Sequence, residues 1–108
     1  MLTPALKMLA DIATKTHTRI QRDFPNIDPV VGINQGMRSN GIPADAMTID
    51  CLKTNRRIII ILHDDQPELI HYQFAFRDKD PFEKFEEIPI NTVTTQLMYD
   101  WIEKYFSA

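Results

Sequence analysis

Two patterns in this sequence of 108 residues predict a single α+β domain. Apolar residues recur at helical spacing near both ends, over residues 1–24 and 92–106, whereas the middle holds short apolar runs separated by turn residues. The connections between those runs are short, which favours antiparallel pairing of consecutive strands. We therefore expect one domain over residues 1–108, in the order helix, long loop, three-stranded antiparallel meander, short helix and final helix.

The composition predicts a soluble globular protein. The chain is 44% hydrophobic and 25% charged, which argues against a disordered chain, a coiled coil or a disulfide scaffold. Its one cysteine, Cys51, cannot form an internal bridge and lies in an apolar run, so we expect a packed thiol in a reducing cytoplasm. A net charge of −3 gives no electrostatic reason for nucleic-acid binding. No apolar run reaches the roughly 18 residues that span a bilayer, so no membrane partner is expected.

The first helix has a clear start. Thr3 can cap the first free amides, and Pro4 suits the first helical position, where a missing N–H costs nothing. His17 falls within the apolar stripe, and we interpret it as a packed histidine with a hydrogen-bonded neighbour rather than as a ligand. The stripe itself consists of Leu6, Leu9, Ala13, Ile20 and Phe24.

Residues 25–46 form the least regular segment. They contain every glycine of the chain, namely Gly32, Gly36 and Gly41, together with three of its seven prolines. The glycine spacing lacks the Gly-Lys-Ser/Thr ending of a phosphate loop, so nucleotide binding is rejected. Apolar residues within the segment favour a loop packed by its own side chains, with a short strand or helical turn near residues 30–33. The alternative is a lid or a partner-binding loop.

Three strands are expected at residues 47–53, 57–63 and 69–77. The second contains five consecutive β-branched or leucine residues, Ile58 to Leu62, so both of its faces require cover. The third strand alternates, with Ile70, Tyr72, Phe74 and Phe76 on one side and with His71, Gln73, Ala75 and Arg77 on the other.

The expected turns determine which side chains share a face. A turn centred on Asn55 and Arg56, followed by one over residues 64–67, places Ile59 and Ile61 with the aromatic residues. The opposite face then carries a spare apolar surface with polar neighbours, and a shift of one residue in either turn would change this partition. We take the following residues as candidates for a ligand site or an interface: Lys53, Ile58, Ile60, His71, Gln73 and Arg77.

The last third of the chain predicts two helices. Asp80, Pro81 and Glu83 form a plausible capping box for a short helix within residues 78–87. Pro89 then interrupts the chain before the final helix, from about Thr92 to Phe106, whose wide apolar face includes Trp101 as a core residue. Asn91 or Thr92 is the expected cap.

The sequence contains no recognisable catalytic motif. His63, Asp64 and Asp65 are interpreted as a turn rather than a metal site, because Asp side chains satisfy local backbone amides. No serine or threonine belongs to a nucleophile motif with a histidine and an acid. We therefore expect neither catalytic residues, nor a metal, nor a cofactor, and enzymatic activity is not favoured.

Two functions from different classes follow from these expectations. The first is a homodimeric interaction module, in which the spare isoleucine face contacts a second copy or another protein. The alternative is a binding protein or modest enzyme for a small anionic ligand, with a pocket under the 25–46 loop lined by His71, Gln73 and Arg77. Cover of the spare face by a helix or by the loop within the monomer would favour this alternative.

Overall fold

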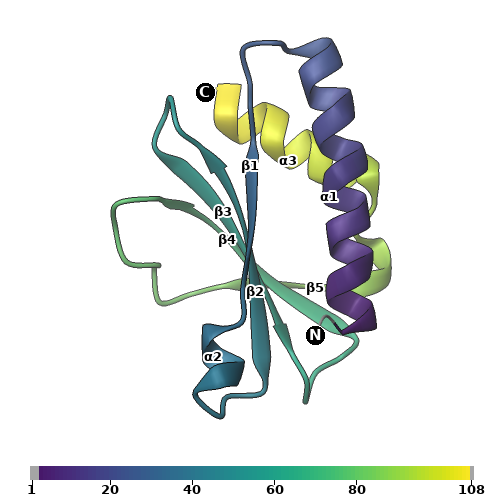
Figure 1. Ribbon diagram of the computed structural model, residues 1–108, viewed down its shortest axis with the longest axis vertical. Coiled ribbons are helices and arrows are strands. Elements are labelled where there is room, and N and C mark those ends of the chain that lie inside the picture. Colours follow the sequence, from purple (N-terminus) through teal and green to yellow (C-terminus); the bar gives the residue numbers. More distant parts are fainter. Residues whose placement is uncertain (1–2, 108) are drawn as a thin grey trace.

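The computed structural model describes residues 3–107 and shows an α+β fold with an antiparallel sheet and a helix near each end (Figure 1). The five strands lie in the order β1-β2-β3-β4-β5. The helical elements are α1 (Pro4–Asp23), α2 (Gly36–Ser39), the 3-10 turn η1 (Ile90–Thr92) and α3 (Thr95–Ser107). The strands are β1 (Val30–Asn34), β2 (Ala44–Cys51), β3 (Arg56–His63), β4 (Leu69–Phe76) and β5 (Glu86–Pro89).

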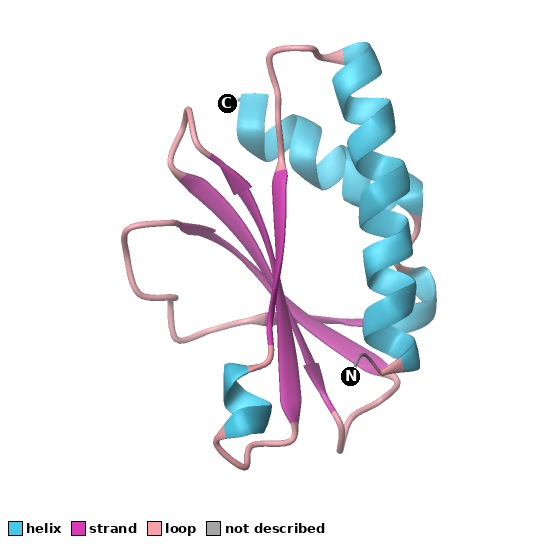
Figure 2. Cartoon of the chain, viewed as in Figure 1, coloured by secondary structure: helices cyan, strands magenta, loops and turns pink. Residues whose placement is uncertain are grey.

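Both long helices cover the same face of the sheet (Figure 2). The core lies between them and the sheet, and its largest fully buried apolar side chains are Leu6, Leu9, Ile20, Met47, Ile49, Ile58, Ile60, Ile70, Met98 and Ile102. Burying one such side chain contributes about 1.5–3 kcal/mol, so this layer is the main source of stability. No helix within residues 3–107 is long and apolar enough to cross a bilayer.

The start of α1 confirms the sequence prediction. The Thr3 hydroxyl accepts a hydrogen bond from the Leu6 amide at 3.2 Å, and Pro4 is the first helical residue. The predicted stripe also faces the core, with Thr16 buried among its apolar members. His17 lies at the margin of this stripe, partly exposed, with Nε2 3.4 Å from the Asp28 carboxylate.

The predicted register is right between β2 and β3 and wrong between β3 and β4. Ile58 pairs with Ile49, which keeps both on one face as predicted. However, Ile58 also pairs with Phe74, and Ile60 with Tyr72. The β3–β4 connection spans residues 64–68 rather than 64–67, and one additional residue exchanges the two faces of β4 relative to β3.

The expected spare isoleucine face is therefore absent. Ile58 and Ile60 lie on the aromatic face under the helices and are 0% and 1% exposed, so neither is available as an interface or ligand residue. Ile59 and Ile61 lie on the opposite face instead, beside Gln73 and His71 respectively.

The sheet has five strands rather than the predicted three. Within the 25–46 segment, residues 30–34 form β1 and pair with β2, which begins three residues earlier than expected. The predicted short helix near residues 78–87 is wrong, because residues 86–89 form β5 and pair with β4. The preceding segment of the chain is instead an irregular loop held by contacts with β4.

The final helix begins slightly later than predicted. Thr94 caps it, since its hydroxyl accepts a hydrogen bond from the Leu97 amide at 3.1 Å. Trp101, predicted as a core residue, is half-buried and packs against β4, stacked on Tyr72 at a ring-centroid distance of 4.5 Å and edge-on to Phe74 at 6.0 Å. The aromatic side chains of β4 therefore form the contact surface for α3.

Candidate functional site

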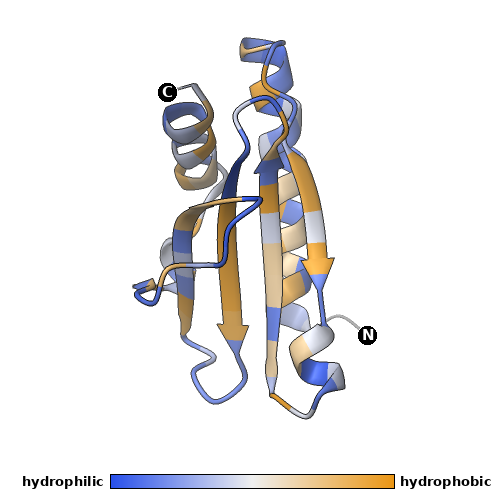
Figure 3. Ribbon diagram, turned by 90° about the vertical axis from the view of Figure 1, so that its left-hand side faces the viewer, coloured by the Kyte–Doolittle hydropathy of each residue, from blue (hydrophilic) through white to orange (hydrophobic). Residues whose placement is uncertain are grey.

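The sheet face away from the helices carries His71 and is crossed by the loop between β4 and β5 (Figure 3). His71 Nε2 lies 3.1 Å from Glu87 Oε1, and the His63 ring meets the His71 ring edge-on at 4.8 Å. His71 Nδ1 is buried without a partner in the described part of the chain. Within residues 3–107, no three His, Cys, Asp or Glu side chains are arranged to hold a metal.

Gln73 is a structural residue rather than a ligand contact. Its side chain is buried and makes three hydrogen bonds with the β4–β5 loop. Nε2 donates to the Phe82 and Lys84 carbonyl groups at 2.9 and 3.0 Å, while Oε1 accepts from the Phe82 amide at 2.8 Å. The pairing of β4 with β5 ends at Tyr72. At the next residue, the side-chain amide of Gln73 takes over and holds the β4–β5 loop against the sheet.

Arg77 belongs to a charge cluster at the other end of this face. Arg57 makes a two-pronged contact with Asp50, with Nε–Oδ1 and Nη2–Oδ2 distances of 2.7 and 2.9 Å. Arg77 Nε approaches the same carboxylate at 3.5 Å. The hydrogen bond to Asp50 raises the pKa of Arg57, so this guanidinium is fixed in its charged form. Arg77 is consequently engaged by a carboxylate rather than free for an anion.

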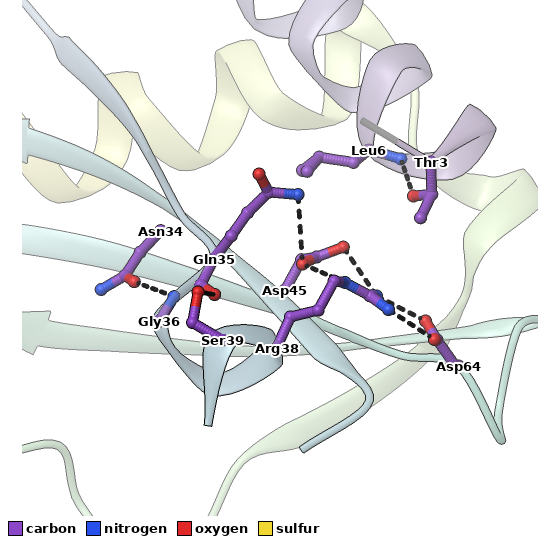
Figure 4. Close-up of polar contacts among 9 residues, drawn as sticks. All are labelled: Thr3, Leu6, Asn34, Gln35, Gly36, Arg38, Ser39, Asp45 and Asp64. Carbon is purple, nitrogen blue, oxygen red and sulfur yellow. Dashed lines mark hydrogen bonds and ion pairs between the residues drawn. The ribbon is translucent and has the colours of Figure 1, made fainter. Parts of the chain in front are cut away.

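A second ion cluster, which the sequence did not predict, anchors α2 to the sheet (Figure 4). Arg38 Nε and Nη2 donate to Asp45 at 2.9 and 3.0 Å, and Nη1 and Nη2 donate to Asp64 at 2.9 and 2.8 Å. Hydrogen bonding to the carboxylates raises the pKa of Arg38, and hydrogen bonding to Arg38 lowers the pKa of Asp64. One cation matched by two carboxylates is not an anion site. Asp64 is 26 residues from Arg38, and no local pattern predicts their contact.

The predicted pocket under the 25–46 segment does not include His71, Gln73 and Arg77. His71 and Gln73 lie on β4, and β2 and β3 separate β4 from β1. The glycines have local roles instead. Gly32 lies within β1, Gly36 donates its amide to Asn34 Oδ1 at 2.7 Å, and Gly41 adopts φ +85° in the turn before β2, which favours glycine.

The free edge of β1 is the surface best suited to bind another chain, because its outward-facing backbone groups have no strand partner within residues 3–107. This strand pairs with β2 on one side and has no strand partner on the other among the described residues. Val30, Val31 and Ile33 are 45%, 38% and 42% exposed. The sequence contains a signal for this strand, a run of five uncharged residues between Pro29 and Gln35, but the neighbouring glycines and prolines favour a packed loop there.

A groove runs beside this edge on the helix side. It has a volume of about 280 Å³ and lies between α1 and the start of the β1 segment. Its lining is mostly small or apolar and consists of Ala10, Ala13, Thr14, His17, Pro29 and Val31. Since α1 does not fill this space, an apolar side chain from outside the monomer can enter it.

The opposite edge of the sheet is protected. β5 is four residues long and contains Glu86, Glu87 and Pro89. Charges and proline on an edge strand oppose pairing with another chain, whereas β1 carries neither. The two edges therefore differ in their capacity for strand addition.

No family model, curated protein or solved structure is significantly similar to this chain.

Proposed function

We propose that this protein is a non-catalytic interaction module that forms a homodimer through the free edge of β1. The observation that carries the proposal is the contrast between an uncharged, apolar β1 edge and a charged, proline-containing β5 edge. Addition of a strand to a sheet edge gains main-chain hydrogen bonds, and the adjacent side chains supply specificity. β1 spans about 16 Å at the usual rise of a strand.

A second copy suits this edge because β1 contains no charged residue. When two copies of β1 pair in antiparallel orientation, no like charges meet across the junction. The two-fold contact also places each copy's groove next to the other copy's exposed side chains. Ala10 and Thr14 on α1 are small, so two α1 helices can approach closely beside the joined strands.

This proposal moves the dimer contact from the predicted isoleucine face to β1. Ile58 and Ile60 are buried and stabilise the monomer core. The exposed apolar residues proposed to form the dimer contact in their place are Val31 and Ile33. Cys51 is buried and unpaired, in keeping with the reducing cytoplasm that we propose as the protein's compartment.

Light scattering coupled to size exclusion, across a hundredfold dilution, tests the proposal. The wild type should show twice the 12.6 kDa chain mass. Val31→Lys should be a monomer with an unchanged circular dichroism spectrum, because the charge would be desolvated at the joined edge. Leu52→Lys is the matched control, since Leu52 is 59% exposed in the β2–β3 turn, and it should remain a dimer.

Two outcomes would contradict the proposal. A wild type that is monomeric at every concentration refutes the homodimer. A dimer that persists in Val31→Lys and in Ile33→Lys refutes the assignment to β1 and directs attention to another surface.

A further inference from the structure

A cavity of about 500 Å³ lies at the end of the sheet where three segments meet. These segments are the turn after α1, the β2–β3 turn and the end of α3. Ile27, Cys51 and Phe106 line it and are almost completely buried, whereas Asn26 and Lys53 are exposed at its margin. Its size lies within the range of about 300–1,000 Å³ that is usual for small-molecule sites.

The polar groups of this cavity differ in whether they already have partners. The Asp23 carboxylate is occupied, since Arg22 Nε and the Tyr99 hydroxyl donate to it at 3.0 and 2.7 Å. Lys53 forms no ion pair within residues 3–107, and the Thr54 hydroxyl is buried without a hydrogen-bond partner there. A cation and a hydroxyl group are therefore uncommitted, while the one carboxylate of the lining is already neutralised.

We propose that this cavity binds a small monocarboxylic acid with an apolar body. The carboxylate pairs with the Lys53 ammonium group, a strong donor to anionic oxygen. The hydrocarbon part packs against Ile27 and Phe106, which removes apolar surface from water. An anionic ligand can pair with the Lys53 ammonium group, which is unpaired within the described residues. A cationic ligand would be repelled by Lys53 and would find no free carboxylate in the described lining, because Asp23 is already occupied.

The site is independent of the proposed dimer. Its lining residues belong to the 23–27, 51–54 and 106–107 segments, and none belongs to β1. It therefore differs in place from the anion pocket expected from the sequence, which was lined by His71, Gln73 and Arg77, although Lys53 was among the candidate ligand or interface residues. A ligand test on the Val31→Lys variant distinguishes failure of this inference from failure of the dimer.

Titration with sodium hexanoate, followed by amide NMR shifts, tests the inference. Saturable shifts are expected around the cavity, and 1-hexanol and hexylamine should bind more weakly. Lys53→Met should weaken hexanoate binding about tenfold, through loss of one charge-assisted contact. Lys84→Met removes an exposed lysine on the β4–β5 loop and should bind as the wild type does.

Alkylation of Cys51 by iodoacetamide provides a second readout, because this is the only cysteine of the chain and it lines the cavity. Hexanoate should slow alkylation in the wild type and have little effect in Lys53→Met. Absence of saturable shifts at millimolar hexanoate overturns the inference. Equal binding of hexanol, or equal affinity in Lys53→Met, overturns the assignment of Lys53 as the carboxylate contact.

Discussion

Replacement of Gln73 by leucine should detach the β4–β5 loop and destabilise the fold. The change keeps a side chain of similar size but removes three hydrogen bonds to Phe82 and Lys84. At about 0.5–1.5 kcal/mol each these bonds sum to about 1.5–4.5 kcal/mol. Apolar burial of leucine and rehydration of the loop offset part of this, so we expect the free energy of unfolding to fall by about 2 kcal/mol.

Urea unfolding monitored by circular dichroism measures that loss, and the melting temperature should fall by about 8–16 °C. Hydrogen exchange of the Phe82 amide should accelerate, because its acceptor has been removed. Phe82→Ala is the control, since the loop contacts use only the backbone of Phe82 and its side chain is 56% exposed. A Gln73→Leu stability within about 0.5 kcal/mol of the wild type, with unchanged Phe82 exchange, would refute this reasoning.

Three further changes test other parts of the structure. Ile60→Lys should unfold the monomer, with loss of the far-ultraviolet helical signal, because Ile60 is 1% exposed in the core. Asp64→Asn should flatten the acid limb of the stability–pH curve. The pKa of Asp64 is lowered from 3.8 by Arg38, so its contribution is present above that value and is lost as pH falls through the folded-state pKa. Tyr105→Phe should cost about 1 kcal/mol in urea unfolding through loss of one hydrogen bond, the 2.7 Å bond to the Ala75 carbonyl.

Local signals in the sequence predicted the two long helices and the central strands well. Thr3 and Pro4 mark the start of α1, and the alternation in β4 separates its aromatic face from its polar face. These signals depend on neighbouring residues and on regular periods, so they do not require knowledge of distant contacts. The α+β architecture follows from them.

The sequence predictions were wrong where a single residue of turn length, or a contact between residues far apart in the chain, determines the structure. A β3–β4 connection of five residues instead of four places Ile58 and Ile60, rather than Ile59 and Ile61, on the same face as the aromatic residues of β4. The Asp80–Glu83 pattern suits a helix cap, but backbone groups of Phe82 and Lys84 bond to Gln73 on β4 instead. The tertiary contacts of this loop therefore override its local helix signal, and such contacts cannot be recognised in a single sequence.

The candidate sites were harder to predict than the fold. Lys53 does line a cavity, but the other lining segments come from residues 23–27 and 106–107, far away along the chain. The exposed edge of β1 follows from its terminal place in the strand order, which depends on the pairing of the whole sheet. Composition alone does not distinguish an edge strand from a central one.

The strand order has a consequence for how the chain folds. Because every strand pairs only with its neighbours in sequence, the sheet can grow hairpin by hairpin without closing a long loop. The packing of α1 against α3 is different, since it joins residues near opposite ends of the chain (Figure 1). We therefore expect the sheet to form early and the docking of the two helices to complete folding, with unfolding beginning at their contact.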